Sequence, residues 1–175
     1  MFEIRWHGRG GQGSFTGAKL LGVAAAIHDD VYAQAFPSFG PERRGAPVLG
    51  FNRISSEKIT DRSEIKTCDY IVFLDDTLYD DSVLDDLKDS DGLVLINTQR
   101  ESWHEKVKCI DATQIALDEL GIPIANTVML GFLAAYAEHA VSYEACAEAI
   151  KSSMKPNLAE KNIKAFRIAY EKGRN

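Results

Sequence analysis

Apolar and polar positions follow a regular pattern along much of the chain. Residues 2–7 read FEIRWH, in which the two kinds of residue alternate with the two-residue period of a β-strand. Two later segments, DYIVFLD and GLVLIN, are continuous apolar runs of the kind found in strands that are buried on both faces. Extended segments are therefore predicted at Phe2–His7, Val31–Phe36, Ala46–Ser55, Asp69–Asp75, Gly92–Asn97 and Lys106–Ala112.

Helical patterns separate some of these strands and fill the C-terminal third. The segment 14–28 is rich in Ala and Gly, which favours a helix packed closely on a sheet. A helix over 113–120 is predicted to end at Gly121, which Pro123 follows closely. Three more helices are expected: one capped by Asn126, one capped by Ser142, and one starting at Pro156 or Asn157, with Ala159, Ile163, Phe166 and Tyr170 on one face. Strands that alternate with helices indicate a layered α/β domain.

Composition narrows the class of protein. The 175 residues suit one domain spanning 1–175, with 45% hydrophobic and 26% charged residues. A net charge of −6 makes general attraction to nucleic acid or to an anionic membrane unexpected. No targeting segment precedes the first strand, and the longest apolar run, LLGVAAAI, is too short to cross a bilayer.

The three cysteines, Cys68, Cys109 and Cys146, lie far apart in the sequence. An odd number at this spacing forms neither a disulfide framework nor the clustered pattern of an iron–sulfur site. A reducing cytoplasm is therefore the expected location. The stretch 75–91 contains eight aspartates, and its spacing predicts a solvated acidic surface and no calcium loop.

A glycine motif follows the first strand. Gly8, Gly10 and Gly13 fit GxGxxG between a strand and a helix, where backbone amides and the helix N-terminus favour an anion. The second strand ends in AQAFP without the acid that holds the ribose of a dinucleotide, so this form of the motif is disfavoured. The loop is either a tight structural turn or a site for phosphate, coenzyme or partner backbone, with Gln12 as a side-chain contact. His7 is interpreted as a structural residue.

A second loop, FPSFGPERRGAPVLGF, places Glu42, Arg43 and Arg44 together. Guanidinium groups pair with phosphate or carboxylate through two hydrogen bonds, and the prolines of the loop limit the entropy lost when it engages a target. An internal ion pair with Glu42 would occupy one arginine. An external anionic target is expected for at least one of the two.

The segments HGRGGQG and FPSFGPERRGAPVLGFNRIS, in this order and spacing, resemble the gamma subunit or gamma domain of the pyruvate and 2-oxoacid:ferredoxin oxidoreductases. The resemblance extends over nearly the whole chain, including DYIVFLD and NTVMLGFLAA. The variant ERRGAPV looks more like subunits that act on pyruvate or branched-chain 2-oxoacids than like 2-oxoglutarate forms. The resemblance implies that this chain is the gamma subunit of a pyruvate:ferredoxin oxidoreductase (pyruvate synthase), with a subunit of a 2-ketoisovalerate enzyme as the alternative.

The resemblance implies a three-layer α/β/α sandwich with a mostly parallel or mixed sheet. Such enzymes convert a 2-oxoacid, coenzyme A and oxidised ferredoxin to acyl-CoA, carbon dioxide and reduced ferredoxin. Thiamine diphosphate, magnesium and iron–sulfur clusters would belong to alpha, beta and delta subunits, so that this chain holds no catalytic residue or metal and is inactive alone. It would complete the assembly and help to bind coenzyme A, with contacts to coenzyme or partner at Gly10, Gly11, Gln12, Gly13, Arg43 and Arg44.

Two other classes stay open from the residues alone. One is a stand-alone nucleotide-binding enzyme of the doubly wound class, which the missing acid at the end of the second strand disfavours. The other is a non-catalytic scaffold that makes no contact with a coenzyme.

Overall fold

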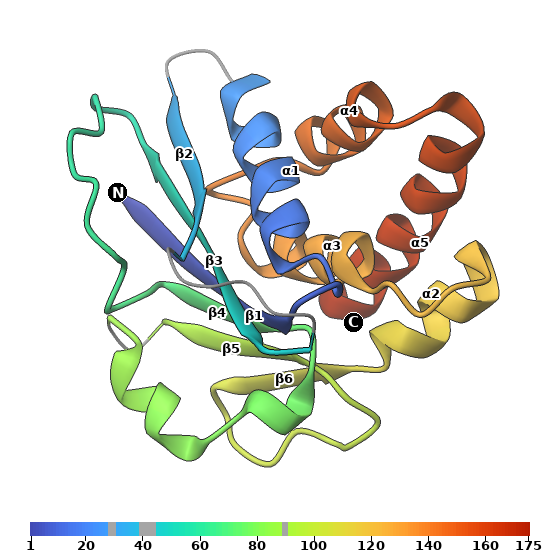
Figure 1. Cartoon of the computed structure of the whole chain (residues 1–175), viewed down its shortest axis with the longest axis horizontal. Helices are drawn as coiled ribbons and strands as arrows, with labels where there is room; N and C mark the ends of the chain where they lie inside the picture. Colours follow the sequence, from blue (N-terminus) through green and yellow to red (C-terminus); the bar gives the residue numbers. More distant parts are fainter. Residues whose placement is uncertain (28–30, 39–44, 89–90) are drawn as a thin grey trace.

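A mixed six-stranded sheet forms the centre of the computed structural model, which describes residues 1–27, 31–38, 45–88 and 91–175 (Figure 1). The strand order is β2-β3-β1-β4-β5-β6. Strands β1, β4, β5 and β6 are parallel, whereas β3 is antiparallel to both β1 and β2. The strands are β1 (Phe2–Arg9), β2 (Tyr32–Pro37), β3 (Pro47–Ser55), β4 (Tyr70–Phe73), β5 (Leu93–Asn97) and β6 (Val107–Ile110). The predicted mixed α/β architecture is confirmed.

The two faces of the sheet are covered differently. The α-helices gather on one side (Figure 1), with α1 against β1–β3 and α3 packed along α5. Their bounds are α1 (Ser14–Ile27), α2 (Ala112–Leu120), α3 (Asn126–Tyr136), α4 (Tyr143–Ser153) and α5 (Pro156–Arg174). The other face is covered by two short 3₁₀ helices, η1 (Asp76–Leu78) and η2 (Asp81–Asp86), and by the segment between β3 and β4. The second covering layer is therefore thinner than a row of α-helices.

Small residues bring α1 close to the sheet, as its Ala/Gly-rich sequence predicts. A Cβ at Gly17 would lie 2.9 Å from the ring of Trp6, which is fully buried on β1. Asn52 of β3 accepts a hydrogen bond from Trp6 Nε1 (3.0 Å) and donates to the Ala18 carbonyl of α1 (2.7 Å). These contacts fix the start of α1 relative to the sheet.

The C-terminal helices pack as closely. Gly131 of α3 lies against the backbone of Phe166 on α5, where a Cβ would overlap the carbonyl oxygen. One turn away, Thr127 Oγ1 donates to Asn162 Oδ1 (2.7 Å), and both side chains are buried. Within the described part of the chain, no helix has the length and apolarity needed to cross a membrane.

The predicted helix ends are largely found. Gly121 ends α2 with a φ of 74°, and the Ser142 hydroxyl accepts from the Ala145 amide at the start of α4. Pro156 begins α5. The prediction that Asn126 caps α3 is wrong, because Ala125 is the cap residue and the Asn126 side chain accepts from the adjacent Thr127 amide.

A buried polar group lies under the thinner layer. Arg5 of β1 is only 8% exposed, and its guanidinium donates to Asp86 Oδ2 (2.5 Å), to the Lys66 carbonyl and to His7 Nε2 (2.9 Å). The His7 ring also stacks on Phe73. Burial, helped by the charge of Arg5 and opposed by Asp86, lowers the pKa of His7 to about 3. His7 is thus a neutral acceptor at pH 7, consistent with the structural role predicted for it.

We expect His7 to make stability depend on pH. The folded chain keeps this ring neutral down to about pH 3, whereas the unfolded chain binds a proton below its usual pKa of 6.5. As the pH is lowered from 6.5 to 5, the free energy of unfolding should therefore decrease. The contribution of His7 to this decrease is up to about 1.4 kcal/mol per pH unit. Urea unfolding of a His7→Gln variant should show a shallower fall than the unaltered chain. A His104→Gln variant, altered at an exposed histidine, is the control, and equal slopes in all three proteins would contradict the assignment.

Candidate functional site

The chain changes direction between β1 and β4, at the centre of the sheet. From β1 it passes to α1 on one face, and from β4 it passes to η1 on the other face. Because the two connections diverge, a crevice opens at the carboxyl ends of these strands, which is where doubly wound folds bind ligands. The structure therefore places its candidate site beside the glycine loop and the end of β4.

The glycine loop is hydrogen-bonded to the chain segment that follows the arginine pair. The Gly10 amide donates to the Ala46 carbonyl (2.9 Å), and the Gly45 amide donates to the Gly10 carbonyl (3.2 Å). Gly11 and Gly13 have φ values of 97° and 83°, a region that favours glycine. The two motifs that the sequence singled out thus meet in the fold.

Arg9 joins these two segments to β4. Its guanidinium donates to Asp75 Oδ2 (3.0 Å), to the Gly45 carbonyl (3.2 Å) and to the Thr77 hydroxyl (2.9 Å). Gln12 completes the link, because its Oε1 accepts from the Arg9 amide (2.7 Å) and its Nε2 donates to Asp75 Oδ2 (3.0 Å). Both ends of the Gln12 amide are therefore engaged within the chain.

Asp75 receives hydrogen bonds from several directions. Partial burial works to raise its pKa, but hydrogen bonds from Thr77 and Gln12 and the charge of Arg9 outweigh it, so that the pKa lies below the usual value. Asp75 therefore stays ionised at neutral pH. Since its side chain is only 15% exposed, the predicted solvated acidic surface does not describe this residue.

The five-residue spacing of the aspartate stretch has a structural cause. Asp75 and Asp80 each precede a short 3₁₀ helix and accept from the backbone amide two residues later. Asp86, the last residue of η2, pairs with the buried Arg5. Exposed positions such as Asp80 fit the acidic surface that the sequence predicts. Asp75 and Asp86 instead stabilise the fold.

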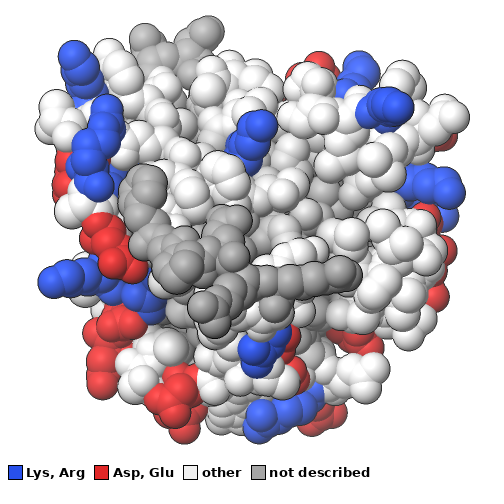
Figure 2. Space-filling view, viewed as in Figure 1, with Lys and Arg blue, Asp and Glu red and all other residues white. Residues whose placement is uncertain are grey.

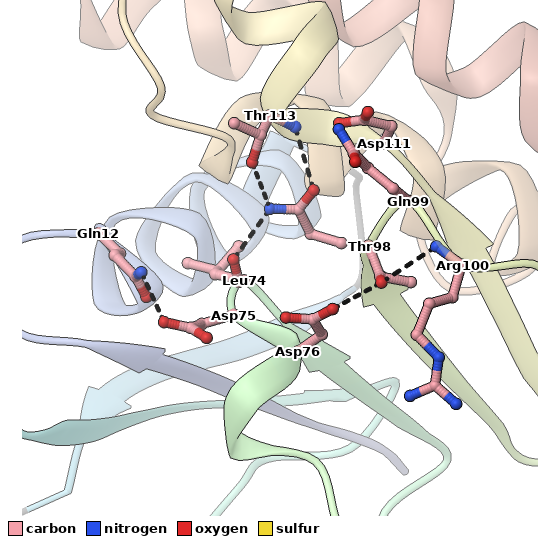
Figure 3. A pocket seen from close by; sticks show the side chains of 10 residues that line it. Gln12, Leu74, Asp75, Asp76, Thr98, Gln99, Arg100, Asp111 and Thr113 are labelled. Carbon is pink, nitrogen blue, oxygen red and sulfur yellow. Dashed lines mark hydrogen bonds between the residues drawn. The ribbon is translucent and has the colours of Figure 1, made fainter.

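A polar pocket of about 570 Å³ lies at this edge of the sheet (Figure 3). Thr98 Oγ1 donates to Asp76 Oδ2 (2.6 Å), and Asn97 Nδ2 donates to the Leu74 carbonyl (3.0 Å) and to Thr113 Oγ1 (2.8 Å). These bonds tie together the ends of β4, β5 and β6. The residues that line the pocket are Gln12, Leu74, Asp75, Asp76, Asn97, Thr98, Gln99, Arg100, Asp111 and Thr113.

Among the described residues that were predicted for the site, only Gln12 lines this pocket. The other residues that line the pocket were not predicted from the sequence. Their positions nevertheless follow a pattern, because Asp75, Asn97 and Asp111 each lie at or just after the end of a strand. The carboxyl ends of parallel strands meet at one edge of a sheet, so such residues come together.

The glycines lie at the rim of the site. A Cβ at Gly11 would meet no described residue within 4 Å, whereas a Cβ at Gly13 would lie 2.5 Å from Asn126 Nδ2. Arg43 and Arg44 lie outside the described residues, and so does Glu42. Gly45, which follows them in sequence, is bonded to the glycine loop.

The topology gives a second reason against dinucleotide binding of the usual kind. In that fold the second strand runs parallel beside the first and carries the acid for the ribose. Here the antiparallel strand β3 occupies the place next to β1, and β2 lies one strand further out. No parallel strand therefore lies next to β1 on that side to carry the acid that would bind the ribose of a dinucleotide.

The cysteines do not suit a metal cluster. Cys68 and Cys146 are buried in different apolar cores, and burial raises the pKa of each thiol to about 12, which keeps it protonated. Across residues 1–27, 31–38, 45–88 and 91–175, no three acidic, histidine or cysteine side chains come together as metal ligands. The described residues therefore contain no group of cysteines of the kind that holds an iron–sulfur cluster.

Comparisons with known proteins agree on one family. The family model described as "Pyruvate ferredoxin/flavodoxin oxidoreductase" matches residues 3–172. The pyruvate synthase subunit PorC of Methanothermobacter marburgensis is 49% identical over 98% of this chain and 97% of its own length. The pyruvate/ketoisovalerate oxidoreductases common subunit gamma of Pyrococcus furiosus is 46% identical over 98% and 97%. The crystal structure of pyruvate oxidoreductase subunit PORC from Thermotoga maritima superposes with a TM-score of 0.83 at 36% identity, over 97% of this chain and 95% of that one.

The two left-handed glycines should respond differently to substitution. Gly13→Ala combines an unfavourable φ with overlap against Asn126, and we expect a loss of about 2–5 kcal/mol in the free energy of unfolding. Gly11→Ala should add only backbone strain, about 1–2 kcal/mol, since its Cβ would meet no described residue within 4 Å. Chemical denaturation of both variants measures the difference. An equal loss at the two positions would contradict the close contact between Gly13 and Asn126.

Proposed function

This chain belongs to the pyruvate ferredoxin/flavodoxin oxidoreductase family, and from that premise we propose that it is the gamma subunit of a 2-oxoacid:ferredoxin oxidoreductase, most closely a pyruvate synthase. The observation that carries the proposal is the 49% identity to a pyruvate synthase subunit over nearly the full length of both chains. The complex oxidatively decarboxylates a 2-oxoacid to an acyl-CoA and passes the electrons to ferredoxin. The whole chain acts as one gamma domain.

The reaction chemistry is assigned to companion subunits. Thiamine diphosphate with its magnesium and the iron–sulfur clusters would sit on subunits of the alpha, beta and delta types, and cofactors of this kind supply the bond-making and electron-transfer steps. The buried, protonated thiols of Cys68 and Cys146 support this division. The three cysteines described are free, in keeping with a complex in a reducing cytoplasm.

Exposed apolar side chains support a role in assembly. Phe15 at the start of α1 is 37% exposed, and Ile122 and Ile124 before α3 are 45% and 37% exposed. The contact of Gly13 with Asn126 brings the starts of α1 and α3 together. Among the described residues, Figure 2 shows few charged side chains around α1, with acidic and basic groups toward the edges of this face. Apolar surface of this kind is typical of protein contacts.

The glycine loop and the arginine pair are the proposed contact region. Gly11 of this loop offers a backbone that a ligand or partner can approach closely, next to the N-terminus of α1, whose first turn has no acid. Gly10, which is bonded to Gly45 and Ala46, and Gly13, which faces Asn126, hold the loop in place beside it. Arg43 and Arg44 would pair with the phosphates of coenzyme A or with a companion subunit. Gln12 supports this loop through its bonds to Arg9 and Asp75.

The identity of the 2-oxoacid is proposed to depend on the companion subunits. The Pyrococcus furiosus relative is named a common subunit of pyruvate and ketoisovalerate oxidoreductases. A gamma subunit of the same kind is compatible with either substrate. We therefore keep a 2-ketoisovalerate enzyme as the second candidate function.

Assembly tests the proposal directly. Affinity-tagged chain, purified from its native cells, should carry the other oxidoreductase subunits, and the purified complex should oxidise pyruvate with ferredoxin and coenzyme A. In complex reconstituted from separate subunits, Phe15→Ser should weaken association by more than tenfold, because aromatic anchors dominate interfaces.

Tyr32→Ser provides the matched control. Tyr32 is also exposed, but it begins β2 at the opposite end of the sheet from the glycine loop. Recovery of tagged chain alone, with no companion subunit, would overturn the proposed function. Equal weakening by Phe15→Ser and Tyr32→Ser would move the interface away from the start of α1.

The contact with coenzyme A has its own test. Replacing Arg43 and Arg44 by Ala should raise the KM for coenzyme A tenfold or more, since each charge-assisted hydrogen bond contributes about 1.5–3 kcal/mol. A Lys161→Ala, Arg167→Ala variant, altered at exposed positions of α5, also loses two positive charges. This control should keep the KM for coenzyme A of the unaltered chain. An unchanged KM in intact complex would remove the coenzyme contact and leave the arginines as docking residues.

A further inference from the structure

The two edges of the sheet differ in their protection against pairing with another chain. Strand β6 ends the sheet on one side, and its four residues include the charged Lys108. Strand β2 ends the sheet on the other side, and its six residues, YAQAFP, include no charged side chain. Soluble proteins usually keep edge strands from pairing by making them short and charged. The β2 edge has no such charge, and only Pro37 at its end limits pairing.

The register between β2 and β3 determines which backbone groups of β2 face outward. The Ser38 amide donates to the Leu49 carbonyl (2.9 Å), and β2 continues in this antiparallel register. In such a pair, only every second residue exchanges hydrogen bonds with the neighbouring strand. Counted back from Ser38, the intervening positions include Ala33 and Ala35. The amides and carbonyls of these two alanines therefore point away from the sheet.

These outward groups have no partner within the described part of the chain. No backbone hydrogen bond between described residues reaches the outward side of Ala33 or Ala35, and both residues are partly exposed. Pro37 occupies the next outward position and has no amide hydrogen, so a ladder on this edge would end there. The edge thus offers a short row of N–H and C=O groups that another extended chain can bond.

Exposed apolar side chains lie beside this edge on both faces of the sheet. On the helical face, Ile27 at the end of α1 is 46% exposed, and α1 packs so closely on β2 that a Cβ at Gly22 would lie 3.0 Å from Ala35 Cβ. Tyr32 at the start of β2 is 50% exposed. Its side chain lies on the opposite face from that of Ala33, which packs on the helical core. Apolar surface therefore accompanies the free backbone groups.

We propose that the β2 edge pairs, antiparallel and about a two-fold axis, with the β2 edge of a second copy of this chain, so that the sheet continues across both copies. In such a contact each copy presents the same surface, and like charges that face each other are destabilising. The chain has a net charge of −6, so an uncharged strip such as β2 is where two copies can approach. Pairing of two β6 edges would instead bring Lys108 near its own copy. This inference goes beyond the proposed function and does not depend on it.

Proline at one outward position tests the pairing and leaves the bonds to β3 in place. In Ala33→Pro the only donor lost is the outward amide. At sedimentation equilibrium the unaltered chain should show twice the 19.3 kDa mass of one chain. Ala33→Pro should raise the dissociation constant of this dimer about tenfold or more, because hydrogen bonds across the edge are lost. Ala33→Ser keeps the amide and should dissociate like the unaltered chain. Circular dichroism and thermal unfolding check the fold of each variant.

Disulfide formation identifies the neighbour of β2. Residues that face each other in an antiparallel pair have Cα atoms about 4.5–5.5 Å apart, which a disulfide can span. The variants Ala33→Cys, Gln34→Cys and Ala35→Cys, each made with Cys109→Ser to remove the partly exposed native thiol, test three positions for the axis. Under mild oxidation at least one should link two copies of this chain, both alone and in the whole complex. Glu160→Cys, at an exposed position of α5, should not.

Three results would overturn the inference. They are a single-chain mass for the unaltered protein at every concentration, equal dissociation of Ala33→Pro and Ala33→Ser, and no disulfide between two copies at any of the β2 positions, including a disulfide to a companion subunit alone. None of these bears on the proposed function, which is tested by recovery of companion subunits with the tagged chain. Conversely, a β2-linked dimer recovered without companion subunits would remove the proposed function and leave this inference standing.

Discussion

The candidate site depends on one charged contact, the pairing of Arg9 with Asp75. Arg9 is the last residue of β1, Asp75 follows β4, and their bond is reinforced by Gln12 and Thr77. Hydrogen bonds between charged groups are about twice as strong as neutral ones, and burying one partner without the other is costly. The same guanidinium holds the Gly45 carbonyl. One side chain thus fixes three segments that are distant in sequence.

The sheet beneath this contact is supported unequally on its two faces. On the helical face, Gly17 and Gly131 allow close approach of helices to Trp6 and to Phe166. On the other face, 3₁₀ helices cover a smaller apolar cluster and the buried Arg5. Parallel strands need cover on both faces, and the short helices capped by Asp75 and Asp80 provide it within few residues. Their capping aspartate Asp75 is also the partner of Arg9, so the thin layer and the site share a residue.

Two regions of opposite electrostatic character adjoin at this edge. The glycine loop leads into the start of α1, whose first turn has no acid, whereas the pocket beside it is lined by Asp76 and Asp111 together with Arg100. The chain belongs to the pyruvate ferredoxin/flavodoxin oxidoreductase family, in which a relative of nearly the same length is named a subunit.

The sequence alone determined the family, the strand–helix order and several helix ends, because these depend on local patterns: GRGGQG and ERRGAPV, the period of FEIRWH, and Gly121 at a left-handed turn. It also indicated the structural role of His7. Only the tertiary structure decided that Gln12 bonds inward to Asp75, that the antiparallel strand β3 takes the place of a dinucleotide-binding strand, and that Asp75, Asn97 and Asp111 meet at one pocket. These features depend on strand order, and strand order brings together residues whose separation in sequence carries no local signal.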